Sequence, residues 1–148
     1  MSAAAWPTVL QPVVRFYEGL DAAALDRIGE IYTERARFKD PFNDVCGTDA
    51  IAGIFRHMYA TTLTPRFVVT AAAASPDGRE GFLTWEFHFR FRRYRPDTEL
   101  TIRGATHLRL ADDGRVCEHR DYWDAAEELY EKLPLIGTLM RGIKRRMA

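Results

Sequence analysis

The chain has 148 residues, of which 47% are hydrophobic, which is enough for a single domain with one core. Basic and acidic residues balance at 21 each, so no overall field favours nucleic acid or an acidic partner. The N-terminal residues do not resemble a secretory signal, and no window reaches the ~18 apolar residues of a membrane span. The two cysteines, Cys46 and Cys117, show no metal-like spacing. We therefore expect a soluble cytoplasmic domain with free thiols.

Helical periodicity dominates the first part of the chain. Residues 8–20 place five large apolar side chains at helical spacing, with Pro12 in the first turn, where its missing N–H costs little. Residues 21–32 predict a second helix that Asp21 would cap. Its apolar face would comprise Leu25, Ile28 and Tyr32.

A short strand is expected next, over residues 36–40, and Pro41 would end it. Because side chains alternate along a strand, Phe38 and Asp40 share one face, and Lys39 points the other way. A loop follows, and Thr48 would cap a third helix that runs to about residue 63.

From residue 66 the hydrophobic pattern changes to period two, which predicts strands over residues 66–74, 81–94, 99–110 and 116–124. In the longest of them, one face carries Trp85, Phe87, Phe89 and Phe91, and the other carries Glu86, His88, Arg90 and Arg92. The tail returns to helical spacing and is broken near Pro134. Helices followed by hairpin-linked strands predict an α+β fold.

The order of elements, the stretch FKDP at residues 38–41 and the closing strand EHRDYWD at residues 118–124 resemble the nuclear transport factor 2-like superfamily. Within it, SnoaL-like and ketosteroid-isomerase-like proteins are most similar, over about residues 8–125. The resemblance implies a cone-shaped domain in which N-terminal helices pack in a strongly bent, mixed or antiparallel sheet. The whole chain, 1–148, would be one domain with a helical tail over residues 126–148.

The resemblance also implies an apolar pocket at the open end of the cone and a homodimer through the outer face of the sheet. It places a general base at Asp40, the aspartate before a proline, with His119 and Asp121 of the last strand as partner acid or orienting groups. The position of the family's first oxyanion donor is Phe16, one residue before Tyr17, and Thr106 replaces the second donor. The implied pocket wall comprises Phe16, Tyr17, Phe38, Phe55, Trp85, Phe87, Thr106 and Trp123.

These features lead us to expect a domain that binds a small apolar molecule, without a cofactor or metal. The associated chemistry would be proton transfer of isomerase, cyclase or dehydratase type, and the alternative is a non-catalytic binding or assembly module. For Asp40 the alternative is a turn acid that binds the backbone of its own loop. For the last strand, a one-residue slip would exchange His119 and Asp121 for Arg120 and Tyr122.

The tail is amphipathic and basic, with Ile136, Leu139 and Ile143 among its apolar residues and Arg141 to Arg146 rich in positive charge. Such a helix either packs its apolar side on a protein surface or binds an anionic membrane. We expect the apolar side to pack on the cone or on a partner chain.

Overall fold

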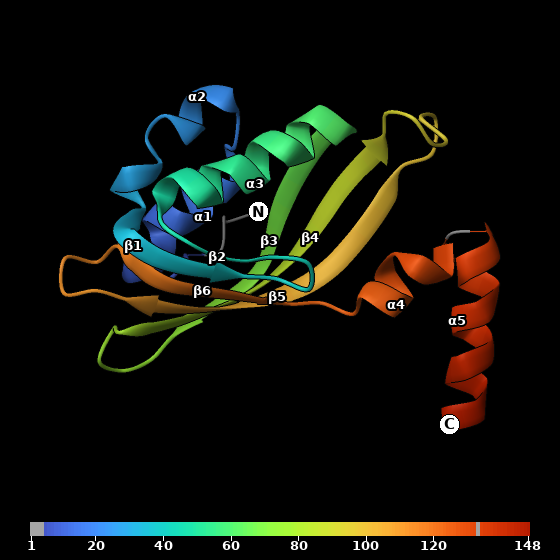
Figure 1. Cartoon of the computed structure of the whole chain (residues 1–148). Coiled ribbons are helices and arrows are strands. Elements are labelled where there is room, and N and C mark those ends of the chain that lie inside the picture. Colours follow the sequence, from blue (N-terminus) through green and yellow to red (C-terminus); the bar gives the residue numbers. More distant parts are fainter. Residues whose placement is uncertain (1–4, 133) are drawn as a thin grey trace.

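The computed structural model describes residues 5–132 and 134–148 and shows one bent, open sheet whose concave face is covered by α1, α2 and α3 (Figure 1). The sheet has six strands in the order β2-β1-β6-β5-β4-β3. Neighbouring strands are antiparallel except β1 and β6, which are parallel. The α+β class and the mixed sheet predicted from the sequence are confirmed, and the cone shape is consistent with this arrangement.

The strands are β1 (Tyr32–Lys39), β2 (Asp44–Cys46), β3 (Thr62–Ala74), β4 (Glu80–Phe91), β5 (Leu100–Leu110) and β6 (Val116–Tyr122). The α-helices are α1 (Gln11–Glu18), α2 (Ala22–Leu25), α3 (Thr48–Thr61), α4 (Ala125–Glu128) and α5 (Pro134–Met147). Three short 3₁₀ turns, η1 (Thr8–Leu10), η2 (Ile28–Glu30) and η3 (Tyr130–Lys132), complete the described elements.

The prediction of a second helix over residues 21–32 is wrong beyond the first turn. Asp21 does cap α2, because its carboxylate accepts the N–H of Ala24 at 2.7 Å. The helix stops at Leu25, η2 follows, and Tyr32 already belongs to β1. Gly29 lowers helix propensity in this stretch, and pairing of Tyr32 with Val116 of β6 offers the backbone a sheet ladder instead. A buried tyrosine therefore enters the sheet rather than a helix face.

The loop after the first strand also differs from the prediction. It contains β2, which pairs with β1 as a hairpin, with Phe38 opposite Val45. The predicted Thr48 cap is wrong, because the N-cap of α3 is Gly47, whose φ of 97° lies in the region that glycine tolerates best. The hairpin holds the end of β1 beside the end of β6.

The core lies between the concave face of the sheet and the helices. From β4, Trp85 and Phe89 are buried and Phe87 and Phe91 pack against the same core, so the aromatic face points inward as the alternation predicts. From β1, Ala36 and Phe38 are buried on that side. The outer face of the sheet carries ion pairs such as Glu86 with Arg103.

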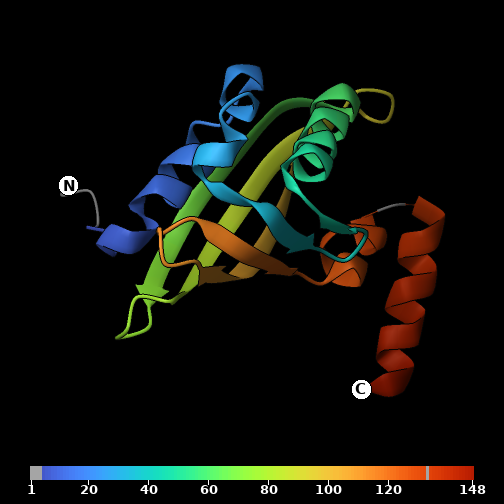
Figure 2. The ribbon, with the colours of Figure 1, turned by 60° about the vertical axis from the view of Figure 1, so that its left-hand side comes forward.

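The tail forms α4, η3 and α5, and α5 packs against α4 and η3. Figures 1 and 2 both show α5 standing at the side of the domain, away from α1, α2 and α3. One side of α5 is exposed, at Ile136, Leu139, Ile143 and Met147. The expectation that this side packs on the cone of the same chain is therefore wrong. None of the described helices is both long enough and apolar enough to cross a membrane.

Candidate functional site

An apolar cavity of about 250 Å³, hereafter the hollow, lies between the concave face of the sheet and α3. Aromatic side chains from β1, β3 and β4 and from α1 and α3 line it. They include Phe38, Phe55, Phe67, Trp85, Phe87, Phe89, Phe91 and Trp123. Few polar groups interrupt this wall, and two of them are the carboxylates of Asp40 and Asp121. Apolar cavities with a few convergent polar groups are typical of ligand sites.

Asp121 belongs to a chain of hydrogen bonds that continues into the core. Its Oδ1 lies 2.8 Å from Nε2 of His119, a side chain with only 2% of its surface exposed. Nδ1 of His119 lies 2.9 Å from the hydroxyl of Tyr32, which in turn is hydrogen-bonded to the hydroxyl of Tyr17. The tyrosines come from β1 and α1, so three elements meet at one buried imidazole.

A second branch reaches Asp121 from β4 and β5. The indole N–H of Trp85 donates to the hydroxyl oxygen of Thr106 at 2.8 Å. That hydroxyl therefore donates its own proton to Oδ1 of Asp121, at 2.5 Å. The bond from Trp85 thus orients the Thr106 hydroxyl, which donates to Asp121.

One assignment of donors and acceptors satisfies both branches. If Asp121 is an acceptor, His119 donates from Nε2, and its Nδ1 accepts the proton of Tyr32, whose oxygen accepts the proton of Tyr17. An ionised Asp121 and a neutral His119 satisfy the whole chain. Oδ1 then receives two hydrogen bonds, whereas Oδ2 receives none from the described residues. Among those residues the only fully buried side-chain nitrogen or oxygen without a partner is Nε of Arg120, so Oδ2 of Asp121 is partly accessible.

Burial sets the protonation of the two tyrosines. It raises the pKa of Tyr17 well above the ordinary value of 10.0, and the hydroxyl of Tyr32 and the charge of Asp121 add to that rise. Burial also raises the pKa of Tyr32 far above its ordinary value, against a smaller lowering by the hydrogen bond from Tyr17. Both tyrosines therefore keep their hydroxyl protons, and Tyr32 has a proton that it can donate to Nδ1 of His119.

A much smaller cavity of about 20 Å³, the chamber, adjoins the hollow. Its polar wall consists of Tyr17, Thr106, His119 and Asp121, and Phe67, Val69, Leu83 and Trp85 complete it. A volume of roughly 10–15 Å³ suffices for one water molecule where polar partners are present. The chamber therefore has room for one water molecule beside Asp121.

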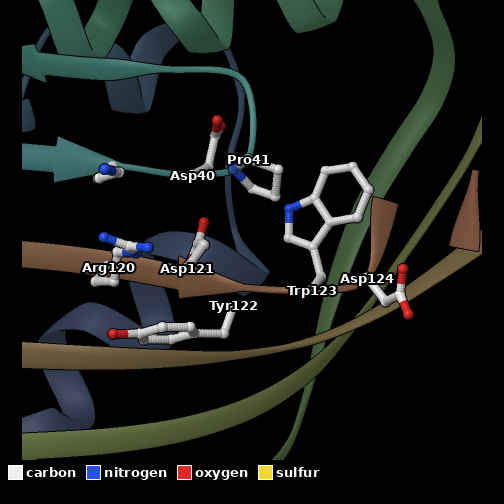
Figure 3. A pocket seen from close by; sticks show the side chains of 8 residues that line it. Asp40, Pro41, Arg120, Asp121, Tyr122, Trp123 and Asp124 are labelled. Atoms are coloured by element: carbon white, nitrogen blue, oxygen red, sulfur yellow. The ribbon is translucent and has the colours of Figure 1, made fainter. Parts of the chain in front are cut away.

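Asp40 and Asp121 stand at neighbouring strand ends with their side chains on the same side (Figure 3). Asp40 lines the hollow, but its carboxylate is occupied by its own turn. Oδ1 accepts the backbone N–H groups of Phe42 and Asn43 at 2.7 and 2.6 Å. Each oxygen also accepts the Asn43 amide at 3.0 Å. These four bonds favour the turn-acid alternative, and the role of Asp40 as a base stays a prediction.

The last strand has the register that the resemblance implies, since His119 is buried on the inner face. Arg120 and Tyr122 lie on the other face, where the guanidinium carbon is 4.9 Å from the centre of the Tyr122 ring. The parallel pairing of β1 with β6 places Phe38 beside His119, and their rings stack with centres 4.4 Å apart. The one-residue slip is therefore excluded.

The implied wall residues divide into three groups. Six of them line the hollow as implied: Tyr17, Phe38, Phe55, Trp85, Phe87 and Trp123. Thr106 lines the chamber instead. Phe16 lies in the core, where its ring packs edge-on against Tyr17. The sequence analysis missed Tyr32 as a site residue, because its spacing from Leu25 and Ile28 suggested a helix. Only the alternation of residues 32, 36 and 38 could have placed it in the sheet.

Comparison with known proteins agrees with the fold. The family model of the SnoaL-like domain matches residues 13–119. No curated protein sequence matches the chain.

Solved structures share the fold at low sequence identity. A hypothetical protein with a ketosteroid isomerase-like fold from Catenulispora acidiphila, in complex with trimethylamine, is 16% identical with a TM-score of 0.70, over 84% of this chain and 92% of that one. An LEH-like epoxide hydrolase from M. tuberculosis is 14% identical with a TM-score of 0.67, over 92% and 91%. A Jannaschia protein classed as a SnoaL-like polyketide cyclase is 17% identical with a TM-score of 0.68, over 80% and 87%. At these identities the likeness shows the fold alone.

Proposed function

Because the chain belongs to the SnoaL-like domain family, we propose that its hollow binds a small apolar molecule and that Asp121 transfers a proton on that molecule without a cofactor. The observation that carries the proposal is the accessible Oδ2 of Asp121. Two hydrogen bonds hold Oδ1, and they fix the orientation of the carboxylate and hence the position of Oδ2.

The chemistry follows from the surroundings of that oxygen. Oδ2 accepts a proton from a carbon next to an electron-withdrawing group, and the C–H electron pair moves into the substrate. The resulting carboxylic acid returns the proton to another atom, which gives an isomerisation, a ring closure or the loss of a leaving group. His119 and Tyr32 act as positioning residues, because they hold the carboxylate and do not line the hollow, whereas Tyr17 belongs both to the hydrogen-bond chain and to the wall of the hollow.

The size of the hollow limits the ligand. Its volume of about 250 Å³ lies below the ~300–1,000 Å³ of sites for drug-sized molecules. An aromatic wall of this size suits a compact molecule with one or two rings. The polyketide cyclase and epoxide hydrolase among the structural neighbours support small-molecule chemistry in this fold.

A general test uses 5-nitrobenzisoxazole, a small flat molecule that opens when a base removes its one reactive C–H proton. The electron pair of that bond forms the nitrile, and the N–O bond breaks to give a coloured phenolate. We expect the protein to accelerate this reaction, and Asp121→Asn to lower kcat/KM by about 10²–10⁴-fold. The variant should stay folded, because an amide oxygen can still accept the bonds from His119 and Thr106.

Asp112→Asn is the matched control, since Asp112 makes an exposed ion pair with Arg79 on a distant turn. It should leave the rate unchanged. An unchanged rate in Asp121→Asn would exclude this carboxylate as the base. Binding of the probe in the hollow with no turnover above that of acetate would favour the alternative, a non-catalytic binding or assembly module.

We also propose a homodimer through the outer face of the sheet. That face is hollowed over β3, β4 and β5 into a shallow depression of about 500 Å³. Its floor is made of small apolar side chains, Ala71, Ala73 and Ala105, and Phe82 and Tyr122 stand exposed beside it. Exposed aromatic rings around a flat apolar floor are typical of protein interfaces.

A further inference from the structure

The helix α5 leaves an apolar stripe exposed beside the domain. Ile136, Leu139, Ile143 and Met147 have 47%, 60%, 43% and 83% of their surfaces exposed. Since successive helical residues are about 100° apart, these four side chains fall within an arc of about 80°. An exposed apolar stripe of this kind costs free energy in water unless something covers it.

The charges of α5 are arranged around this stripe. The helix carries Arg141, Lys144, Arg145 and Arg146 and no acidic residue. By the same spacing, Lys144 and Arg146 border the stripe on its two sides, and Arg145 lies opposite it. Basic residues in the last turn complement the helix dipole, but the dipole accounts neither for the exposed stripe nor for its flanking charges.

We propose that α5 binds the surface of an anionic lipid bilayer, with the apolar stripe inserted at the headgroup boundary. Apolar residues flanked by long basic side chains, with low overall hydrophobicity, are the pattern of helices that lie in a membrane interface. Charge complementarity favours this occupant over a second copy of the chain. The four basic residues add attraction toward anionic headgroups, whereas the outer face of the sheet presents basic and acidic residues in pairs, such as Glu86 with Arg103.

Apolar residues connect the hollow with the base of α5. Trp123 and Leu129 line the hollow on the side of α4, and Phe42, which is 55% exposed, contacts Trp123 and Tyr130 of η3. The turn η3 packs against α5. An apolar rim therefore continues from the hollow to the bound helix, and an apolar molecule dissolved in the membrane reaches the hollow with little exposure to water.

The test is co-sedimentation of the full chain with vesicles of phosphatidylcholine alone and with vesicles in which phosphatidylglycerol replaces part of it. We expect binding to the anionic vesicles only, and weaker binding as salt is added. Leu139→Ser combined with Ile143→Ser should lower the partition coefficient by about tenfold or more, because two buried side chains are lost. Arg146→Gln should lower it by about fivefold.

Arg145→Gln is the matched control, because it removes the same charge from the adjacent residue on the opposite side of the helix. It should change binding less than Arg146→Gln. Equal binding of the wild-type chain to neutral and anionic vesicles, or no binding to either, would overturn the proposal. Light scattering on the same samples tests whether a second copy of the chain covers the stripe instead. If the wild-type chain forms a dimer and binds no vesicles, and the Leu139→Ser, Ile143→Ser chain is a monomer, the stripe would be assigned to a second copy. The outcome is independent of the proton-transfer assay, which uses no lipid.

Discussion

At the scale of single residues, two carboxylates border one hollow but have different hydrogen-bond partners. The four bonds on Asp40 come from its own turn, whereas one oxygen of Asp121 is held and the other is accessible. A general base needs an oxygen that can reach the proton of the substrate. The accessible oxygen therefore identifies Asp121 as the stronger candidate for the base.

We predict that Asp40→Asn keeps the fold and lowers proton transfer on 5-nitrobenzisoxazole by less than Asp121→Asn does. An asparagine oxygen still accepts the backbone N–H groups of Phe42 and Asn43, so the turn is preserved. The measurement is kcat/KM for the two variants side by side. A larger loss in Asp40→Asn would restore the role that the family resemblance implies for Asp40.

Alkaline stability should report the two buried tyrosines. Their pKa values are raised in the folded state, so between about pH 10 and those raised values the unfolded chain binds fewer protons than the folded one. The free energy of unfolding then falls as pH rises, by about 1.4 kcal/mol per pH unit for each tyrosine. Below about pH 10 both states are protonated and this contribution does not change.

The variant Tyr32→Phe isolates the effect of one tyrosine. Urea unfolding should show about 1–3 kcal/mol lower stability at neutral pH, because Nδ1 of His119 loses its donor. Above about pH 10 the stability should fall less steeply than in the wild-type chain. Equal slopes in the two chains would mean that Tyr32 does not stay protonated in the core.

At the scale of elements, the site depends on close packing between β4 and β5. Gly104 lies opposite Trp85, and a Cβ at this position would overlap the indole ring. The absence of a side chain lets that ring lie flat on β5 and donate to Thr106. One glycine thus positions the branch of hydrogen bonds that reaches Asp121.

Gly104→Ala is predicted to destabilise the domain by about 1–3 kcal/mol and to change the near-ultraviolet spectrum of Trp85. Gly53→Ala is the control, because a Cβ there meets nothing within 4 Å. It lies within α3, where alanine is the better helix former, and should stabilise by up to about 1 kcal/mol. An unchanged stability in Gly104→Ala would show that Trp85 has room to move.

The sequence predicted these elements unevenly. The aromatic alternation of β4 follows from period-two patterning, which a buried sheet face imposes directly, whereas the inward face of β6 was implied by the family resemblance. The sequence did not predict that the first residues of β1 form a strand, because Leu25, Ile28 and Tyr32 also fit the spacing of a helix. Pairing with β6 favours the strand over the helix. The bonds of Asp40 depend on the conformation of residues 41–43, which no short pattern specifies.

At the scale of the whole molecule, the sequence established the α+β class, but the order of the strands required the structure. The parallel pairing of β1 with β6 joins segments far apart in the chain and brings Tyr32 to His119. The exposed side of α5 was also unpredictable, since an amphipathic pattern shows that a helix has an apolar face but not what covers it.

The proposed dimer is testable at this scale. Phe82 is 47% exposed on the outer face and stacks on His107, so a charge there would be buried in the dimer. Phe82→Glu should yield a monomer by light scattering, whereas Val9→Glu, at an exposed apolar residue outside the depression, should remain a dimer. A monomeric wild-type chain would exclude the interface.

The most direct test of the central claim is a crystal structure of the chain with 5-nitrobenzotriazole, a stable molecule that has the shape of the reacting probe and carries an N–H where the probe carries the reactive C–H. We predict that its rings lie against Phe87 and Trp123 in the hollow and that the N–H donates to Oδ2 of Asp121 at about 2.7–3.2 Å. A molecule that binds outside the hollow, or whose N–H contacts Asp40 instead, would contradict the assignment of Asp121 as the base.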